Sequence, residues 1–298
     1  MLDYQALRAL AAVVRTGSFE KAARTLAVTP SAVSQRIKQL EERVGAVLVA
    51  RGNPCLATEQ GAWLCRHVEQ VEMLEGNLME HLPALKPETG AMPVTVSVAT
   101  NADSLGTWFV AAASDFAKSS GMLLDIAVDD QDHTADWLKA GRVLAAVTGL
   151  DKPVTGCRRH PLGKLRYHAT ASPDFVARHF PDGVTPEALA RAPALTYNQK
   201  DRLQARFLEK AFGREIAVPT HLLPSTHAFV EAALSGMGWG MNPAILVDRH
   251  LQSGHLVDLV PGIVIDVPLD WQVNRLVAGE LEGLTKAVVA AGRRGLVG

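Results

Sequence analysis

Residues 18–44 of this 298-residue chain are SFEKAARTLAVTPSAVSQRIKQLEERV, and this stretch indicates what the N-terminal part of the protein does. Ser18 is a favourable N-cap for a short helix. A second helix begins with Thr29 as its N-cap and Pro30 in the first turn, where the missing N–H costs nothing. Its apolar positions have helical spacing and predict one buried face: Val33, Ile37 and Leu40. Two helices joined by a short break predict a helix–turn–helix.

The polar residues of the second helix are candidates for contacts with DNA. Short hydroxyl and amide side chains can approach base edges, and basic side chains can neutralise phosphates. An ordinary pair of helices with a solvated polar face is the alternative interpretation. The candidate DNA-binding residues in this helix are Ser31, Ser34, Gln35, Arg36 and Lys38.

The order of motifs resembles the N-terminal domain of LysR-type transcriptional regulators. The matching positions are Leu7, Val13–Val14, Gly17–Ser18–Phe19, Ala22–Ala23, Leu26, Ser31–Ala32–Val33–Ser34, Ile37 and Leu40–Glu41. Residues 44–51 and Thr58–Glu59–Gln60–Gly61 resemble the wing of that domain and the start of its linker helix. The resemblance implies a winged helix–turn–helix over residues 1–58 that binds double-stranded DNA. Arg51, in the wing, is a further candidate contact to phosphate or the minor groove.

A long helix is predicted after the wing, from the cap Thr58 to about Leu82. Its apolar residues recur every three or four positions: Leu64, Val68, Val71, Leu74, Leu78 and Leu82. This stripe either packs on its own domain or forms a coiled coil with a second copy. The resemblance favours the dimer, with a tetramer as a further possibility. Residues 85–90 have the Pro, Gly and polar composition of a hinge, so residues 59–90 are predicted as linker helix and hinge.

The overall composition is that of an ordinary globular protein, with 48% hydrophobic residues, 20% charged residues and a net charge of −1. The charges are unevenly distributed. Residues 1–66 hold nine Lys or Arg and five Asp or Glu. Residues 67–88 hold one Lys or Arg and five Asp or Glu. A basic head followed by an acidic connector fits a molecule with one end facing DNA.

The cysteines and the N-terminus indicate a cytoplasmic protein. Cys55, Cys65 and Cys157 form no CxxC pair and have no His at metal-ligand spacing, which predicts reduced thiols and no metal site. The first residues contain Asp3 and lack a continuous apolar stretch. No run of about 18 uncharged apolar residues is present either, so we expect neither export nor a membrane span.

From Met92 onward, short apolar strands alternate with helical patterns, which predicts an α/β fold with parallel sheets covered by helices. The resemblance adds a division into two lobes, like those of periplasmic binding proteins, with a small effector in the cleft between them. It implies a regulatory domain over residues 91–298. We expect lobe I to comprise residues 91–162 and 267–298, and lobe II to comprise residues 163–266.

Within the family, the chain is most similar to the branch that responds to arginine and lysine and controls basic amino-acid export and metabolism (the ArgP/LysG type). The positions that carry this similarity are residues 101–105, 107–108, 128–130, 180–185, 225, 228–230, 253–259 and 261–262. His227 and the segment 239–242 depart from the pattern of the branch. The similarity implies a basic amino-acid effector. The departures leave a different small effector as the alternative.

A pocket for such an effector needs an anion site for its carboxylate and carboxylates for its cationic groups. Residues 100–104 and 225–226 are predicted helix N-termini that favour an anion. Asp103, Asp129, Asp130 and Asp132 follow strand ends that meet at one edge of a parallel sheet. Asp103 equally fits a residue that offsets the helix dipole, Asp129 and Asp130 fit a solvated loop, and Ser225 fits a simple cap. The candidate effector-binding residues are Asn101, Asp103, Ser104, Asp129, Asp130, Thr148, Ser225 and Thr226.

The motifs favour a regulator over an enzyme. The sequence has no nucleophile elbow, no HExxH pair and no phosphate-binding glycine loop. A transport binding protein is disfavoured by the N-terminal head, and an architectural DNA-binding protein without an effector is the remaining alternative. We expect a regulator that needs no cofactor, whose partners are promoter DNA, a second copy of itself and RNA polymerase.

Overall fold

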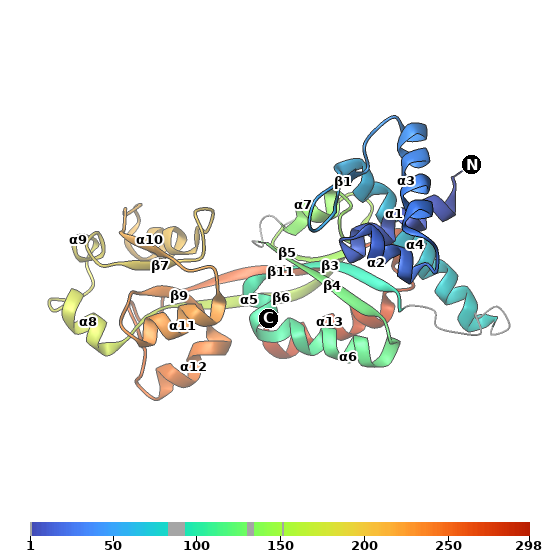
Figure 1. Ribbon diagram of the computed structural model, residues 1–298. Helices are drawn as coiled ribbons and strands as arrows, with labels where there is room; N and C mark the ends of the chain where they lie inside the picture. The colour runs from blue at the N-terminus through green and yellow to red at the C-terminus, as the bar shows by residue number, and fades with distance from the viewer. Residues whose placement is uncertain (1, 83–92, 130–133, 151) are drawn as a thin grey trace.

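The computed structural model describes residues 2–82, 93–129, 134–150 and 152–298. Figure 1 shows three parts: a helical head, a central α/β lobe beside it, and a second α/β lobe at the far end. Two long strands run from the central lobe into the far lobe. No helix in the described ranges combines the length and apolar character that a membrane span requires.

The head is a three-helix unit whose caps are those expected from the sequence. Helix α1 (Tyr4–Thr16) begins at Asp3, whose carboxylate accepts hydrogen bonds from backbone N–H groups of the first turn. Helices α2 (Phe19–Thr25) and α3 (Pro30–Val44) begin after Ser18 and Thr29, whose hydroxyls also accept backbone N–H groups. Their apolar faces form one core with α1. The predicted helix–turn–helix is therefore confirmed.

The predicted wing is also present. Strands β1 (Val49–Ala50) and β2 (Leu56–Ala57) pair antiparallel after α3. The Glu41 carboxylate at the end of α3 accepts the backbone N–H of Leu48 at 2.8 Å. This bond fixes the position of the wing relative to α3.

Helix α4 (Glu59–His81) joins the head to the regulatory part of the chain, beginning at the predicted cap Thr58. Val68 is buried in the core of the head, and Met73 is buried in the core of the regulatory domain. Leu74, Leu78 and Leu82 are each about half exposed. The first part of the predicted stripe thus packs within the chain, while its last three leucines face outward. The predicted hinge lies outside the described residues.

Lobe I, the central lobe, is built around two parallel strand pairs, β3 with β4 and β3 with β5. The helical stretch after β3 contains a π-helical turn, so it forms three consecutive segments. The elements of lobe I are β3 (Thr95–Asn101), α5 (Ala102–Ser104), η2 (Leu105–Phe109), α6 (Val110–Ser120), β4 (Leu123–Asp129), α7 (Thr134–Lys139), β5 (Ala145–Thr148), η3 (Arg275–Val277) and α13 (Glu282–Gly295).

Lobe II holds a small parallel pair, β7 with β8, and several short helices. Its elements are α8 (Pro173–His179), α9 (Pro186–Leu189), β7 (Ala194–Thr196), α10 (Leu203–Phe212), β8 (Thr220–Leu222), α11 (Thr226–Leu234), β9 (Gly240–Pro243), α12 (Ala244–Gln252) and β10 (Val257–Asp258). In Figure 1 these elements lie at the end of the molecule opposite the head.

Two long antiparallel strands, β6 (Cys157–Ala171) and β11 (Val264–Asn274), connect the lobes and place β9 and β10 in the same sheet as lobe I. The prediction that the sheets are parallel is therefore wrong for these strands. Strand β6 includes Pro161 and Gly163, which locally disfavour a strand, but pairing with β11 keeps this segment extended. The predicted lobe boundaries fall inside these two strands.

Candidate functional site: the effector cleft and the DNA-contacting face

Helix α3 presents one polar face away from the core of the head. Successive residues of a helix are about 100° apart, which places Ser31, Gln35 and Lys38 opposite the buried Val33 and Ile37. The side chains of these three polar residues are exposed. Lys38 lies 3.7 Å from the Glu42 carboxylate, one turn further along the same face. This face has the shape and the donor groups that a major groove accepts.

The other candidate DNA-binding residues lie at the margins of that face. Ser34 and Arg36 are half-buried, and Arg36 lies on the flank of α3 rather than on the outer face. Arg51 is exposed in the wing, with its guanidinium 5.3 Å from the centre of the Phe19 ring. Neither arginine lies on the outer face of α3, so both are candidates for contacts to phosphates rather than to base edges.

The candidate effector site lies where strands β3 and β4 end. These strands pair in register so that Asn101 is opposite Asp129, and Asp103 follows in the first turn of α5. Asn101, Asp103 and Asp129 line one hollow together with Tyr197, Asp201 and Leu203 of lobe II. The carboxyl ends of parallel strands thus bring two of the predicted acidic residues together.

Asp103 connects the two lobes. One of its carboxylate oxygens accepts a hydrogen bond from the Tyr167 hydroxyl at 2.7 Å, and the other accepts one from the Thr226 hydroxyl at 2.6 Å. Thr226 begins helix α11 of lobe II, and Tyr167 lies on β6. The lobes are also close next to this contact, because a β-carbon added at Gly106 would lie 3.3 Å from the His227 ring.

Tyr197 and Asp201 were missed by the sequence analysis. They follow strand β7 of lobe II, and Asp201 accepts backbone N–H groups of Tyr197 and Leu203 at 3.1 and 3.0 Å. These bonds shape the loop before α10 and aim a third carboxylate at the hollow. The same strand-end rule that identified Asp129 applies to β7 and could have found Asp201.

The cleft is acidic and narrow. A second hollow beside the first is lined by Asp103, Asp201, Thr226 and apolar residues of lobe II. The described residues that line the two hollows include three aspartates and no Lys, Arg or His. The hollows have volumes of about 30 and 20 Å³, roughly enough for one or two water molecules each. In this structure the two hollows are too small to hold an amino acid.

Of the other candidate effector residues, Asn101 lines the first hollow, whereas Ser104, Thr148 and Ser225 line neither hollow. Asn101 is buried, and its side chain caps α5 by accepting the Ser104 N–H at 3.0 Å. Ser104 is fully buried, with no hydrogen-bond partner for its hydroxyl among the described residues, and lines neither hollow. Thr148 accepts a hydrogen bond from Gln272 beneath the cleft, while Ser225 is exposed and caps α11. Asp130 lies outside the described residues.

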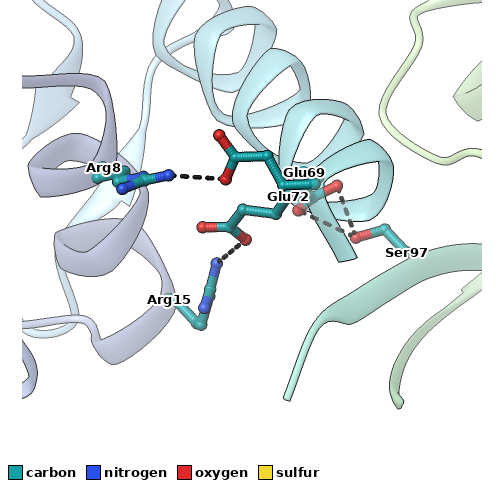
Figure 2. A network of polar contacts seen from close by, with 6 residues as sticks. Arg8, Arg15, Glu69, Glu72 and Ser97 are labelled. Atoms are coloured by element: carbon teal, nitrogen blue, oxygen red, sulfur yellow. Dashed lines mark hydrogen bonds and ion pairs between the residues drawn. The ribbon is translucent and has the colours of Figure 1, made fainter. Parts of the chain in front are cut away.

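Ion pairs join helix α1 of the head to the linker helix α4, and one carboxylate of α4 contacts lobe I (Figure 2). Arg8 and Arg15 of α1 contact Glu75 and Glu72 of α4 at 2.8 and 3.4 Å. Glu69 of α4 lies between α1 and β3, with both carboxylate oxygens 3.4 Å from the Ser97 hydroxyl. Burial raises the pKa of Glu69 to about 7.

The thiols show no feature of a reactive site. Cys55 and Cys157 are buried, and Cys65 is partly buried on α4. Burial, with Glu69 nearby, raises the pKa of the Cys65 thiol to about 12. A thiol with such a pKa is almost entirely protonated at neutral pH and therefore a poor nucleophile.

Comparison with known proteins identifies the family. Residues 4–62 match the family of bacterial regulatory helix–turn–helix proteins of the lysR type, and residues 94–291 match the LysR substrate binding domain. The chain belongs to the LysR family of transcriptional regulators. Membership confirms the predicted fold class and the prediction of a DNA-binding regulator rather than an enzyme.

Individual members of the LysR family are similar to this chain over most or all of its length. The regulator ArgP of Pseudomonas aeruginosa is 46% identical over 297 residues, which cover 100% of this chain and 98% of that protein. The C-terminal domains of a LysR family protein from Agrobacterium tumefaciens are 64% identical, with a TM-score of 0.67 over 68% of this chain and 98% of theirs. Full-length LysG from Corynebacterium glutamicum with bound effector Arg is 35% identical, with a TM-score of 0.69 over 100% of both chains.

Proposed function

We propose that this LysR-type regulator senses a basic amino acid, arginine or lysine, in the cleft between its lobes and controls genes of amino-acid transport or export. The observation that carries this proposal is the convergence of Asp103, Asp129 and Asp201 on one hollow. Neighbouring carboxylates repel one another, and a cation placed between them relieves that repulsion. A guanidinium or ammonium group is therefore the ligand that this lining favours.

The relatives support the same class of ligand. Two groups of full-length relatives are named ArgP and LysG, and the LysG structure from Corynebacterium glutamicum contains arginine as its effector. The three acidic side chains of the cleft supply the complementary charge in this chain.

The effector acts on the contact between the lobes. The hydrogen bond between Asp103 and Thr226 joins lobe I to lobe II, and the hollow next to it is too small for an amino acid. Binding therefore changes the spacing of the lobes. Because the head and α4 contact lobe I, this change alters the placement of the heads and their contacts with RNA polymerase. Its size is limited by the difference in effector affinity between the two states.

DNA binding requires two copies of the head. The exposed leucines of α4, Leu74, Leu78 and Leu82, offer an apolar stripe for a second copy. A dimer would place two α3 helices in successive major-groove half-sites, and a tetramer would pair two such dimers.

Calorimetric titration of the full chain with arginine, lysine, citrulline and glutamate tests the proposed effector. Citrulline has nearly the shape of arginine without its side-chain charge. We expect arginine or lysine to bind at least about tenfold more tightly than citrulline, since a charged hydrogen bond contributes about 1.5–3 kcal/mol. Preferential binding of glutamate or citrulline would point to a different effector. If none of these amino acids bound, the proposal of a basic amino-acid effector would be wrong.

A further inference from the structure

Helix α7 holds one wall of the cleft in place. The indole Nε1 of Trp137 donates a hydrogen bond to the Oδ2 atom of Asp129 at 3.0 Å. Behind this pair lies an open hollow of about 300 Å³, lined by Asp129, Asp136, Trp137, Ala140 and Arg142. Asp129 therefore stands between the cleft and this outer hollow. The indole fixes one of its oxygens and so limits the directions in which the carboxylate can point.

Trp137 is rigidly connected to the turn that ends α7. The carbonyl of Trp137 accepts the backbone N–H of Arg142 at 2.7 Å. The Arg142 guanidinium lies 5.5 Å from the centre of the Trp137 ring. Gly141, between them, has a φ of +58°, which favours glycine. A displacement of Trp137 is therefore passed on to Gly141 and Arg142.

The same turn rests on the linker helix. A β-carbon at Gly141 would lie 3.1 Å from the Nε atom of Arg66 on α4. Arg66 is only 7% exposed, its Nη2 atom has no hydrogen-bond partner among the described residues, and its guanidinium lies 4.4 Å from the centre of the Trp63 ring. A buried guanidinium that lacks a full set of acceptors is poorly compensated, so small movements of its neighbours change its free energy.

We infer that α7 couples the effector to the linker helix, with Trp137 as the positioning residue for Asp129 and the Gly141 turn as the contact to Arg66. This inference rests on the proposed function, because it assigns the effector's cationic group to Asp129. A cation bound at Asp129 interacts with the same carboxylate as the Trp137 indole and shifts the position of that indole. Helix α7 moves with Trp137, and the Gly141 turn then moves relative to Arg66. The effector and the linker helix are then coupled through one short helix in the same chain.

The first test is the substitution Trp137→Phe, which keeps an aromatic ring and removes the N–H. Titration of the full-length variant should show arginine binding weakened about five- to tenfold, with citrulline binding unchanged. Trp137→His, which restores a ring N–H, should recover part of the loss. Trp271→Phe is the matched control, because it removes an indole hydrogen bond to Thr285 in lobe I away from the cleft. Equal loss for arginine and citrulline, or none for either, would overturn the positioning role.

The second test follows α4 by hydrogen exchange with and without saturating arginine. In the wild type, arginine should change amide exchange in the segment around Arg66. In Trp137→Phe and in Arg66→Met this change should disappear, while Arg66→Met keeps the wild-type preference for arginine over citrulline. If amide exchange in α4 of the wild type did not change when arginine bound, the proposed coupling would be wrong, while the positioning role of Trp137 would stand. If the wild type bound neither arginine nor lysine, the proposed function would fail, and this inference with it.

Discussion

Single carboxylates have different roles in this protein because their surroundings differ. Asp103 accepts two hydroxyl hydrogen bonds and joins the lobes, whereas Asp129 is held by an indole. Glu69 has weak contacts to one hydroxyl and lies in a partly buried position between the head and lobe I. The first two suit charge recognition in the cleft, and the third responds to pH.

The interface between the linker helix and lobe I should be more stable at acidic pH because of Glu69. The groups around this carboxylate are Arg15 of α1, Cys65 and Glu72 of α4, Ser97 of β3 and Asp125 of β4. Since the folded pKa is about 7 and the usual value is 4.5, stability is fully present below pH 4.5 and is lost as the pH rises through 7. Glu69→Gln should therefore match the wild type near pH 4 and exceed it at pH 8.5, by up to about 3 kcal/mol.

Thermal unfolding of wild type and Glu69→Gln across this pH range checks the prediction. The exposed Glu209→Gln substitution on α10 serves as the control and should show no such divergence. A Gln variant that is less stable than the wild type at every pH would mean that the charged form of Glu69 is favoured in the fold.

The sequence identified the acidic residues that follow strands but not their partners. Asp103 and Asp129 were predicted because strand ends in α/β sheets meet at one edge, and Asp201 obeys the same rule after β7. Trp137 could not be predicted as a partner of Asp129. That contact depends on how α7 packs on β5 and β3, which leaves no pattern in the sequence.

At the scale of elements, the two sides of α3 should make different contributions to DNA binding. Gln35 lies on the exposed outer face and Arg36 on the flank. Gln35→Ala should relax sequence preference, at a cost of about 1–3 kcal/mol for the preferred site. Arg36→Ala should weaken binding to all sequences and reduce the salt slope by about one unit. Fluorescence anisotropy with specific and random duplexes at several salt concentrations measures both effects.

Arg191→Ala, an exposed substitution in lobe II, is the control for the loss of one positive charge. It should leave binding to both duplexes nearly unchanged. A salt slope that is insensitive to Arg36 would place this side chain away from the phosphates.

The exposed leucines of α4 should hold two copies of the chain together. Leu78 is 52% exposed in the single chain, and a charge there would be buried in a coiled-coil seam. Leu78→Arg should shift the protein from dimer to monomer in sedimentation equilibrium and weaken its binding to a two-site promoter. Leu222→Arg, which changes a leucine of similar exposure in lobe II, should have no effect. A Leu78→Arg protein that stays dimeric would place the interface elsewhere.

Helices that begin at a recognisable cap residue were predicted better than strands that depend on pairing with a distant part of the chain. The caps Ser18, Thr29 and Thr58 gave the helix starts to within a residue. The first half of β6 was missed because Pro161 and Gly163 disfavour a strand locally. Its pairing with β11, about a hundred residues away, supplies the hydrogen bonds that override this preference.

At the scale of the whole molecule, the regulatory domain is two lobes joined by β6 and β11 and held together at Asp103 (Figure 1). Lobe I contacts the linker helix through Met73, Glu69 and Arg66, so a change in lobe spacing reaches the head through the same chain. The sequence alone indicated only an α/β domain. The division into two lobes was predicted only from the family resemblance. The chain passes between the lobes along extended strands, without a helical crossover that a sequence pattern could have indicated.

The most direct test of the central claim measures whether Asp129 recognises the positive charge of the effector. Arginine and citrulline are titrated calorimetrically into the wild type, Asp129→Asn and the control Asp115→Asn, which changes an exposed carboxylate on α6. The wild type and the control should prefer arginine over citrulline by about tenfold or more, and Asp129→Asn should lose most of this preference. An Asp129→Asn protein that retains the full preference for arginine would contradict the assignment of the cationic group to this cleft.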